Sequence, residues 1–162
     1  MQLIPFDRCD NLRLTAEVSR NGNRLEFVYE VSGETADVVL PPHAPRERTD
    51  GLWQATCFEA FISMGKTGYA ELNFAPSGAW AAYRFGDYRQ DMREQEMPPP
   101  SISFAGNRLT AEVELDIPPG APLNLTAVIE HNSGSRSYWA LAHPNSNRPD
   151  FHARDCFVAS LP

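Results

Sequence analysis

The chain has 162 residues and a formal net charge of −7, from 14 basic and 21 acidic side chains. The length suits one domain with a sizeable core, so we expect a single domain over residues 1–162, and the excess of acid argues against nucleic acid or anionic membrane as partner. Hydrophobic residues make up 42% of the sequence and charged residues 22%, which is the balance of a soluble globular protein and not of a disordered chain.

Short segments of alternating apolar and polar residues dominate the first part of the chain. Residues 12–18 place Leu12, Leu14, Ala16 and Val18 on one side of an extended strand. The alternation resumes over residues 25–31, after the turn-forming run 21–23. The pattern predicts a β-hairpin.

Three further segments in the middle of the chain predict a meander of strands. Residues 56–63, 69–75 and 79–85 are rich in aromatic and β-branched residues, and turn-forming residues 65–68 and 76–78 separate them. Residues 87–97 have the composition of a helix but lie between Gly86 and three prolines, which permits a short helix or an exposed loop.

The last part of the chain returns to strand patterns. Residues 102–104 and 109–115 predict a second hairpin, and residues 123–131, 138–142 and 156–161 predict three more strands. About ten strands with almost no helix favour an all-β, antiparallel fold, a two-layer β-sandwich of the immunoglobulin-like or jelly-roll kind.

The sequence shows no targeting or crosslinking signal. No apolar run approaches the roughly 20 residues that span a bilayer, and residues 1–8 lack the features of a secretory signal. Cys9, Cys57 and Cys156 have no close pairing such as C-x-x-C, which favours buried thiols over disulfides or a zinc site. We therefore expect a cytoplasmic protein.

The common catalytic and cofactor motifs are missing from the sequence. It contains no G-x-G-x-x-G, P-loop, G-x-S-x-G or H-E-x-x-H pattern. Three of the four histidines, His131, His143 and His152, fall in the last 32 residues, but without the local spacing of a structural zinc site. We predict neither a metal site nor a cofactor.

Polar residues on the middle strands are the best candidates for a site. Glu59 lies in a strand whose two faces are both largely apolar, so its charge needs a partner. Glu71 and Asn73 share one face of the next predicted strand. If the strands are neighbours in one sheet, a polar cluster beside two tryptophans results. The polar residues are Glu59, Glu71, Asn73 and Arg84, and the tryptophans are Trp53 and Trp80.

Such a cluster has two interpretations. Sugars bind through a flat aromatic face against the C–H side of the ring and through hydrogen bonds from Arg, Asn and carboxylates to the hydroxyls. The same residues also fit a buried arginine–carboxylate pair that only fixes the register of the strands. The sequence leaves both open.

Longer stretches resemble the DOMON-like proteins of bacteria, relatives of carbohydrate-binding module family 9. Residues 50–62 carry the Trp and the Glu-containing strand of those modules, and residues 69–78 match Tyr-x-Glu-hydrophobic-Asn-x-x-Pro-x-Gly. Residues 109–118, 137–141 and 149–152 resemble later parts of the family. Thr56 stands where the family has an aspartate.

The resemblance implies a DOMON-like sandwich that binds a ligand without catalysis, most directly a sugar. The positions that match the family's sugar site are Trp53, Glu59, Asn73, Trp80 and Arg84. Another DOMON branch binds haem, for which Met64 and His131 would be the axial ligands. Two alternatives stay open: a structural or protein-interaction sandwich, and a glycosidase built on Glu59 and Glu71.

Overall fold

The computed structural model describes residues 1–145 and 147–162, and these residues form twelve strands, three short 3₁₀-helices and no α-helix. None of the helices is long and apolar enough to cross a membrane. The 3₁₀-helices are η1 (Thr35–Asp37), η2 (Leu52–Gln54) and η3 (Arg154–Cys156). The strands are β1 (Gln2–Pro5), β2 (Leu12–Asn21), β3 (Arg24–Gly33), β4 (Cys57–Ser63), β5 (Tyr69–Phe74), β6 (Trp80–Phe85), β7 (Arg93–Glu94), β8 (Ser101–Ala105), β9 (Arg108–Glu114), β10 (Pro122–Glu130), β11 (Arg136–Ala140) and β12 (Ala159–Ser160).

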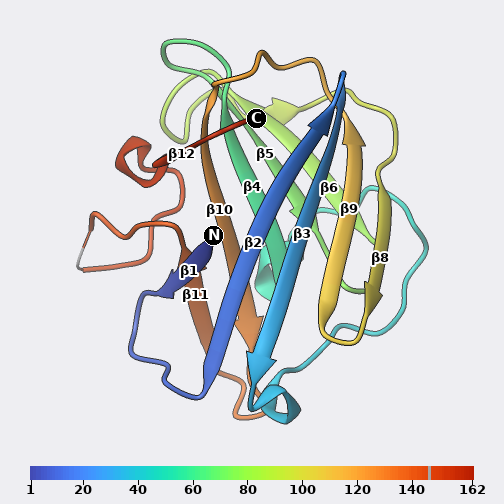
Figure 1. Cartoon of the computed structure of the whole chain (residues 1–162), viewed down its shortest axis with the longest axis vertical. Helices are drawn as coiled ribbons and strands as arrows, with labels where there is room; N and C mark the ends of the chain where they lie inside the picture. Colours follow the sequence, from blue (N-terminus) through green and yellow to red (C-terminus); the bar gives the residue numbers. More distant parts are fainter. Residues whose placement is uncertain (146) are drawn as a thin grey trace.

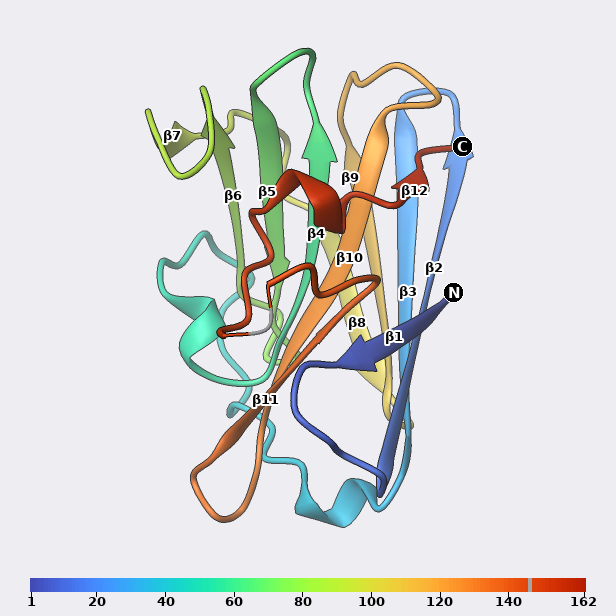
Figure 2. The same ribbon diagram turned by 90° about the vertical axis from the view of Figure 1, so that its left-hand side faces the viewer.

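The strands pair antiparallel in one continuous curled sheet. Its order is β7-β6-β5-β4-β10-β11-β1-β2-β3-β9-β8, and β12 pairs with β10. The curl places β2, β3, β9 and β8 across from β10, β4, β5 and β6, as two layers seen face-on in Figure 1 and edge-on in Figure 2. Strand β1 joins the layers because it pairs with β2 on one side and β11 on the other.

The predicted all-β, antiparallel fold is confirmed, with differences in detail. Both predicted hairpins form, and the turn between β8 and β9 holds Gly106 and Asn107 at positive φ, as a tight two-residue turn requires. Residues 87–97 form a loop with the short strand β7 and no helix. The four-residue strand β1 was not predicted, because so short a segment shows too little alternation.

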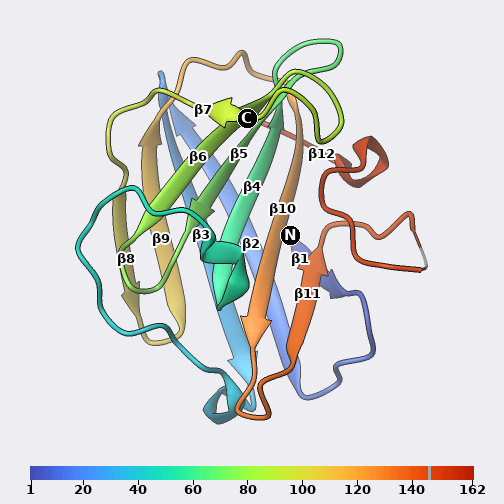
Figure 3. The ribbon, with the colours of Figure 1, turned by 180° about the vertical axis from the view of Figure 1, so that it is seen from behind.

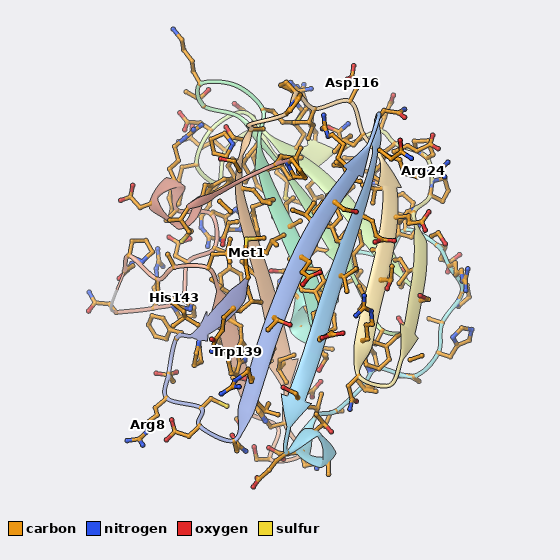
Figure 4. All side chains as sticks on the ribbon, in the orientation of Figure 1. Met1, Arg8, Arg24, Asp116, Trp139 and His143 are labelled. Atoms are coloured by element: carbon orange, nitrogen blue, oxygen red, sulfur yellow. The ribbon has the colours of Figure 1, made fainter. Side chains whose placement is uncertain are left out.

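The main hydrophobic core lies between the two layers. Alternate residues of β2, β3 and β9, including Leu14, Phe27 and Ala111, pack against Phe58 and Leu72 of the opposite layer. Trp139, labelled in Figure 4, belongs to this core. The apolar residues of the alternating pattern therefore face this core.

The layer formed by β4, β5, β6 and β10 is also covered on its outer face. A second apolar cluster lies there, in which Phe61 and Tyr83 pack with Phe151 from the C-terminal segment. Figure 3 shows η2 and the red C-terminal segment on this side of the sheet. Because both faces are covered, every residue of β4 and β5 is buried.

Candidate ligand-binding site

A cavity of about 470 Å³ lies on the outer face of this layer. Its floor consists of strand residues: Glu59, Phe61, Glu71, Tyr83, Phe85, Val128, Arg136 and Tyr138. Its walls come from η2, from the loop after β6 and from the C-terminal segment: Trp53, Gln54, Arg89, Met92, Pro149, Phe151 and His152. Segments far apart in the sequence therefore meet at one site.

Strand register decides which side chains reach the cavity. Glu59 pairs with Asn73 across β4 and β5, and Glu71 pairs with Tyr83 across β5 and β6. Directly paired residues point to the same face of a sheet, and the direction alternates along each strand. The odd-numbered residues of these three strands therefore face the cavity side, and the even-numbered residues face the main core.

Two buried carboxylates lie in the floor of the cavity. Glu59 is 2% exposed and Glu71 is 5% exposed. The Thr126 hydroxyl donates to Glu59 Oε2 at 2.9 Å, and Asn73 Nδ2 donates to Glu71 Oε1 at 2.9 Å. Burial raises the pKa of both carboxyls, and the charge of Glu71 raises the pKa of Glu59 further. The pair therefore holds a proton more readily than exposed glutamates do.

His152 lies at the wall beside Glu71. The Tyr69 hydroxyl donates to His152 Nδ1 at 2.7 Å and accepts from the backbone N–H of Arg89 at 3.2 Å. This network assigns the ring proton to Nε2, which lies 3.8 Å from Glu71 Oε2. Burial lowers the pKa of His152 to about 4. His152 is therefore neutral at neutral pH, and its contact with Glu71 is not an ion pair.

Asp150 connects two of the cavity walls. It is 7% exposed, accepts a hydrogen bond from the Tyr88 hydroxyl at 2.6 Å and pairs with Arg89 Nη2 at 2.9 Å. These two bonds keep the pKa of Asp150 below its ordinary value although burial acts in the opposite direction. The loop after β6 is thereby fixed to the C-terminal segment.

Aromatic rings surround the polar groups. Trp53 is 40% exposed, and its ring meets that of Tyr83 edge-on, with centroids 6.1 Å apart. The Tyr83 hydroxyl donates to Asp50 Oδ1 at 2.5 Å, which fixes the ring. Tyr69 stacks on Phe85, with centroids 4.8 Å apart. The site thus combines flat apolar faces with carboxylates, which is the chemistry expected of a binding site for small polar molecules.

The structure divides the five predicted site residues between the two faces of the sheet. Trp53 and Glu59 line the cavity, and Asn73 lies fully buried where it holds Glu71. Trp80 instead lies in the main core, 4% exposed, and Arg84 lines a separate hollow.

The expected single cluster around Trp80 and Arg84 is therefore not formed. Both are even-numbered residues of β6, and the β5–β6 register turns them away from Glu71. The guanidinium of Arg48 lies over the Trp80 ring, 4.5 Å from its centroid. Neither residue reaches the cavity that Glu59 lines.

Several lining residues were not predicted from the sequence. Tyr83 lies on the opposite face of β6 from Trp80 and Arg84, so a known strand register would have indicated that it lines the cavity. Arg89, Phe151 and His152 lie in loops, where no periodicity indicates direction.

The residues considered for haem do not come together. Met64 follows the end of β4, whereas His131 follows the end of β10, and antiparallel pairing of these strands places the two residues at opposite ends. Both ring nitrogens of His131 are engaged, with Asp37 Oδ2 and Ser137 Oγ, each at 2.8 Å. In residues 1–145 and 147–162 no group of three His, Cys, Asp or Glu side chains has the arrangement of a metal site.

The comparison with solved structures finds chains similar to this one. No protein-family model matches the sequence, and no curated protein matches it. The fold is similar to the crystal structure of a protein of Bacteroides uniformis named a "putative carbohydrate-binding protein", with a TM-score of 0.61 and 16% sequence identity, covering 95% of this chain and 83% of that one. At this identity the similarity shows the fold alone.

Proposed function

We propose that this chain is a noncatalytic binding protein whose ligand is a sugar, held in the cavity between η2 and the C-terminal segment. The observation that supports this most strongly is the meeting of Trp53, Tyr83 and the two buried carboxylates in one cavity of about 470 Å³. That volume falls within the range of small-molecule sites. The name of the structural neighbour, a carbohydrate-binding protein, agrees with this proposal.

The lining groups suit the two sides of a sugar ring. The exposed ring of Trp53 offers a surface for the C–H face, an interaction of about 0.5 to 1.5 kcal/mol. Carboxylate oxygens accept hydrogen bonds from hydroxyls, and Arg136 supplies donors at the edge. Because the carboxylates are buried, a ligand without matching hydroxyls leaves them unsatisfied, which provides selectivity.

The fold family and the cellular location of the protein belong to the same proposal. We assign the curled sheet to the DOMON-like sandwiches related to carbohydrate-binding module family 9, on the resemblance of residues 50–62 and 69–78. A cytoplasmic location agrees with the three free cysteines, Cys9, Cys57 and Cys156, since thiols stay reduced there.

Calorimetric titration against a panel of mono- and disaccharides tests the proposal. We expect binding to wild type and a loss of about two- to ten-fold in affinity for Trp53→Ala, because the stacking face is removed. Phe6→Ala, which truncates a half-buried ring outside the cavity, is the matched control and should bind as wild type. Absence of binding to every sugar would overturn the proposal.

The noncatalytic part needs its own test, because two carboxylates with raised pKa values also fit acid–base chemistry. Incubation with a panel of aryl glycosides should release no more aryl alcohol from wild type than from the double variant Glu59→Gln, Glu71→Gln. Turnover by wild type that the double variant loses would show an enzyme instead.

A further inference from the structure

The floor of the cavity is acidic, and no described residue forms an ion pair with it through a buried, charged basic group. Arg89 pairs with Asp150 at 2.9 Å and is 47% exposed along its side chain. Arg136 is exposed at the start of β11. His152, the nearest basic side chain to Glu71, is neutral because burial lowers its pKa. The charge of Arg89 lowers the pKa of Glu71, but among the described residues neither carboxylate has a charged ion-pair partner.

Each carboxylate also has an oxygen without a close donor. Thr126 donates to Glu59 Oε2, and no described residue donates to Oε1. Asn73 donates to Glu71 Oε1, whereas Oε2 has only His152 Nε2 at 3.8 Å, which is too long for a hydrogen bond. Both residues are more than nine-tenths buried and both line the cavity. The free oxygens therefore face the cavity and are available to a ligand.

The two carboxylates are close enough to share one ligand group. Glu59 pairs directly with Asn73, so Glu71 is its diagonal neighbour on the adjacent strand. Diagonal neighbours on one face lie about 7 Å apart. The ring of Tyr83, directly opposite Glu71, and the ring of Trp53 border the same space, and aromatic faces attract cations. The arrangement favours a compact cation over a neutral hydroxyl.

We propose that the ligand is an amino sugar whose ammonium group lies between Glu59 and Glu71. An ammonium has three donors and no acceptor, so it satisfies the free oxygens of both residues at once and supplies the missing positive charge. This inference rests on the proposed function, since it names the class of sugar that the same cavity takes.

Binding of the ammonium is linked to a proton. Burial gives both carboxyls a raised pKa, so the unoccupied pair keeps a proton that an arriving ammonium replaces. The other titratable and charged groups around the pair are Tyr29, Cys57, Tyr69, Tyr83, Tyr138, Asp50, Arg48, Arg89, Arg136, Asp150 and His152. Tyr69, Tyr83 and Cys57 have a pKa raised by burial, so they stay neutral at neutral pH.

Matched pairs of sugars test the inference directly. At pH 6.5, calorimetry compares glucosamine with glucose, galactosamine with galactose and mannosamine with mannose. We expect at least one amino sugar to bind about ten-fold or more tightly than its neutral counterpart, as for a close buried charge pair. The same titration in two buffers of different ionisation enthalpy should show release of about one to two protons for each amino sugar bound.

Variants identify the groups responsible. Glu59→Gln and Glu71→Gln keep an acceptor for Thr126 and Asn73 but lose the charge, so the affinity for the amino sugar relative to its neutral counterpart should fall about ten-fold. Glu112→Gln, an exposed glutamate on β9, is the control and should not change this relative affinity.

The outcomes separate the two proposals. Equal affinity for amino and neutral sugars in wild type, or no proton release, would overturn the inference and leave sugar binding intact. No binding of any sugar would remove both. The proton release is measured on wild type, so the result does not depend on whether a variant folds.

Discussion

Glu59 and Glu71 are carboxylates that the fold removes from water. Transfer of a carboxylate from water into a protein interior is unfavourable unless a cation or several donors compensate. Here one hydroxyl and one amide are the close donors of the pair. The pair is therefore a source of instability in the absence of ligand, which is common where a residue serves binding.

The pH dependence of stability should show that the buried pair of glutamates destabilises the folded protein. Glutamate has an ordinary pKa of 4.5, and burial raises the pKa of both residues in the folded state. At these two residues the folded protein then binds more protons than the unfolded chain. Their contribution to stability is therefore full below pH 4.5 and is lost as the pH rises through the folded pKa values. Between pH 6.5 and 8 we expect urea denaturation to show a loss on the order of 1 kcal/mol in wild type and less in Glu59→Gln. An equal dependence of the unfolding free energy on pH in the two proteins would contradict the assignment of this loss to Glu59.

His152 should change the stability of the protein in the opposite sense at lower pH. Its folded pKa of about 4 lies below the ordinary 6.5, so the folded state disfavours the charged ring. Stability is then lost as the pH falls from 6.5 towards 4. In a Glu59→Gln background, which weakens the opposing effect, we expect a loss of about 1 to 2 kcal/mol that His152→Gln removes. The same acid loss in both proteins would exclude His152 as its source.

Substitutions of Trp53 and Trp80 should affect stability to very different extents. Trp80 is 4% exposed in the main core, whereas Trp53 is 40% exposed at the cavity. Trp80→Ala leaves a large void and should destabilise the protein by about 3 to 5 kcal/mol, whereas Trp53→Ala should cost less than about 1 kcal/mol. Thermal unfolding checks both. A large loss for Trp53→Ala would mean that its ring supports the fold.

At the scale of elements, the sequence predicted strands better than it predicted their register. Alternation over residues 12–18 and 109–115 is clear because one face of these strands is exposed. Strands β4 and β5 are buried on both faces, so their sequences do not indicate which face is which. Glu71 and Arg84 were therefore placed together, although the register separates them.

Asp150 should hold the loop after β6 against the C-terminal segment. Asp150→Ala removes the acceptor of Tyr88 and the partner of Arg89. Hydrogen bonds to a charged group contribute about 1.5 to 3 kcal/mol, so amide hydrogen exchange over residues 87–92 should become about ten-fold faster or more. Asp155→Ala, an exposed aspartate on the same segment, is the matched control. Unchanged exchange in Asp150→Ala would show that other contacts hold the loop.

At the scale of the whole molecule, strand count and composition predicted the all-β architecture but not how its two layers are joined into one sheet. Continuity of the sheet depends on β1, four residues that pair on both sides. The cavity depends on Phe151 and His152, which cover the outer face from the far end of the chain. Contacts over such sequence separations leave no local pattern, so neither feature could be predicted from one sequence.

The central claim is that a sugar binds at the cavity beside η2, and the three tryptophans allow a direct measurement. Each indole N–H gives its own signal in a ¹H–¹⁵N spectrum, and only Trp53 lines the cavity, whereas Trp80 and Trp139 lie in the main core. Titration with a binding sugar should shift the Trp53 signal and leave the other two in place. A Trp53 signal that stays still while Trp80 or Trp139 moves would contradict the claim.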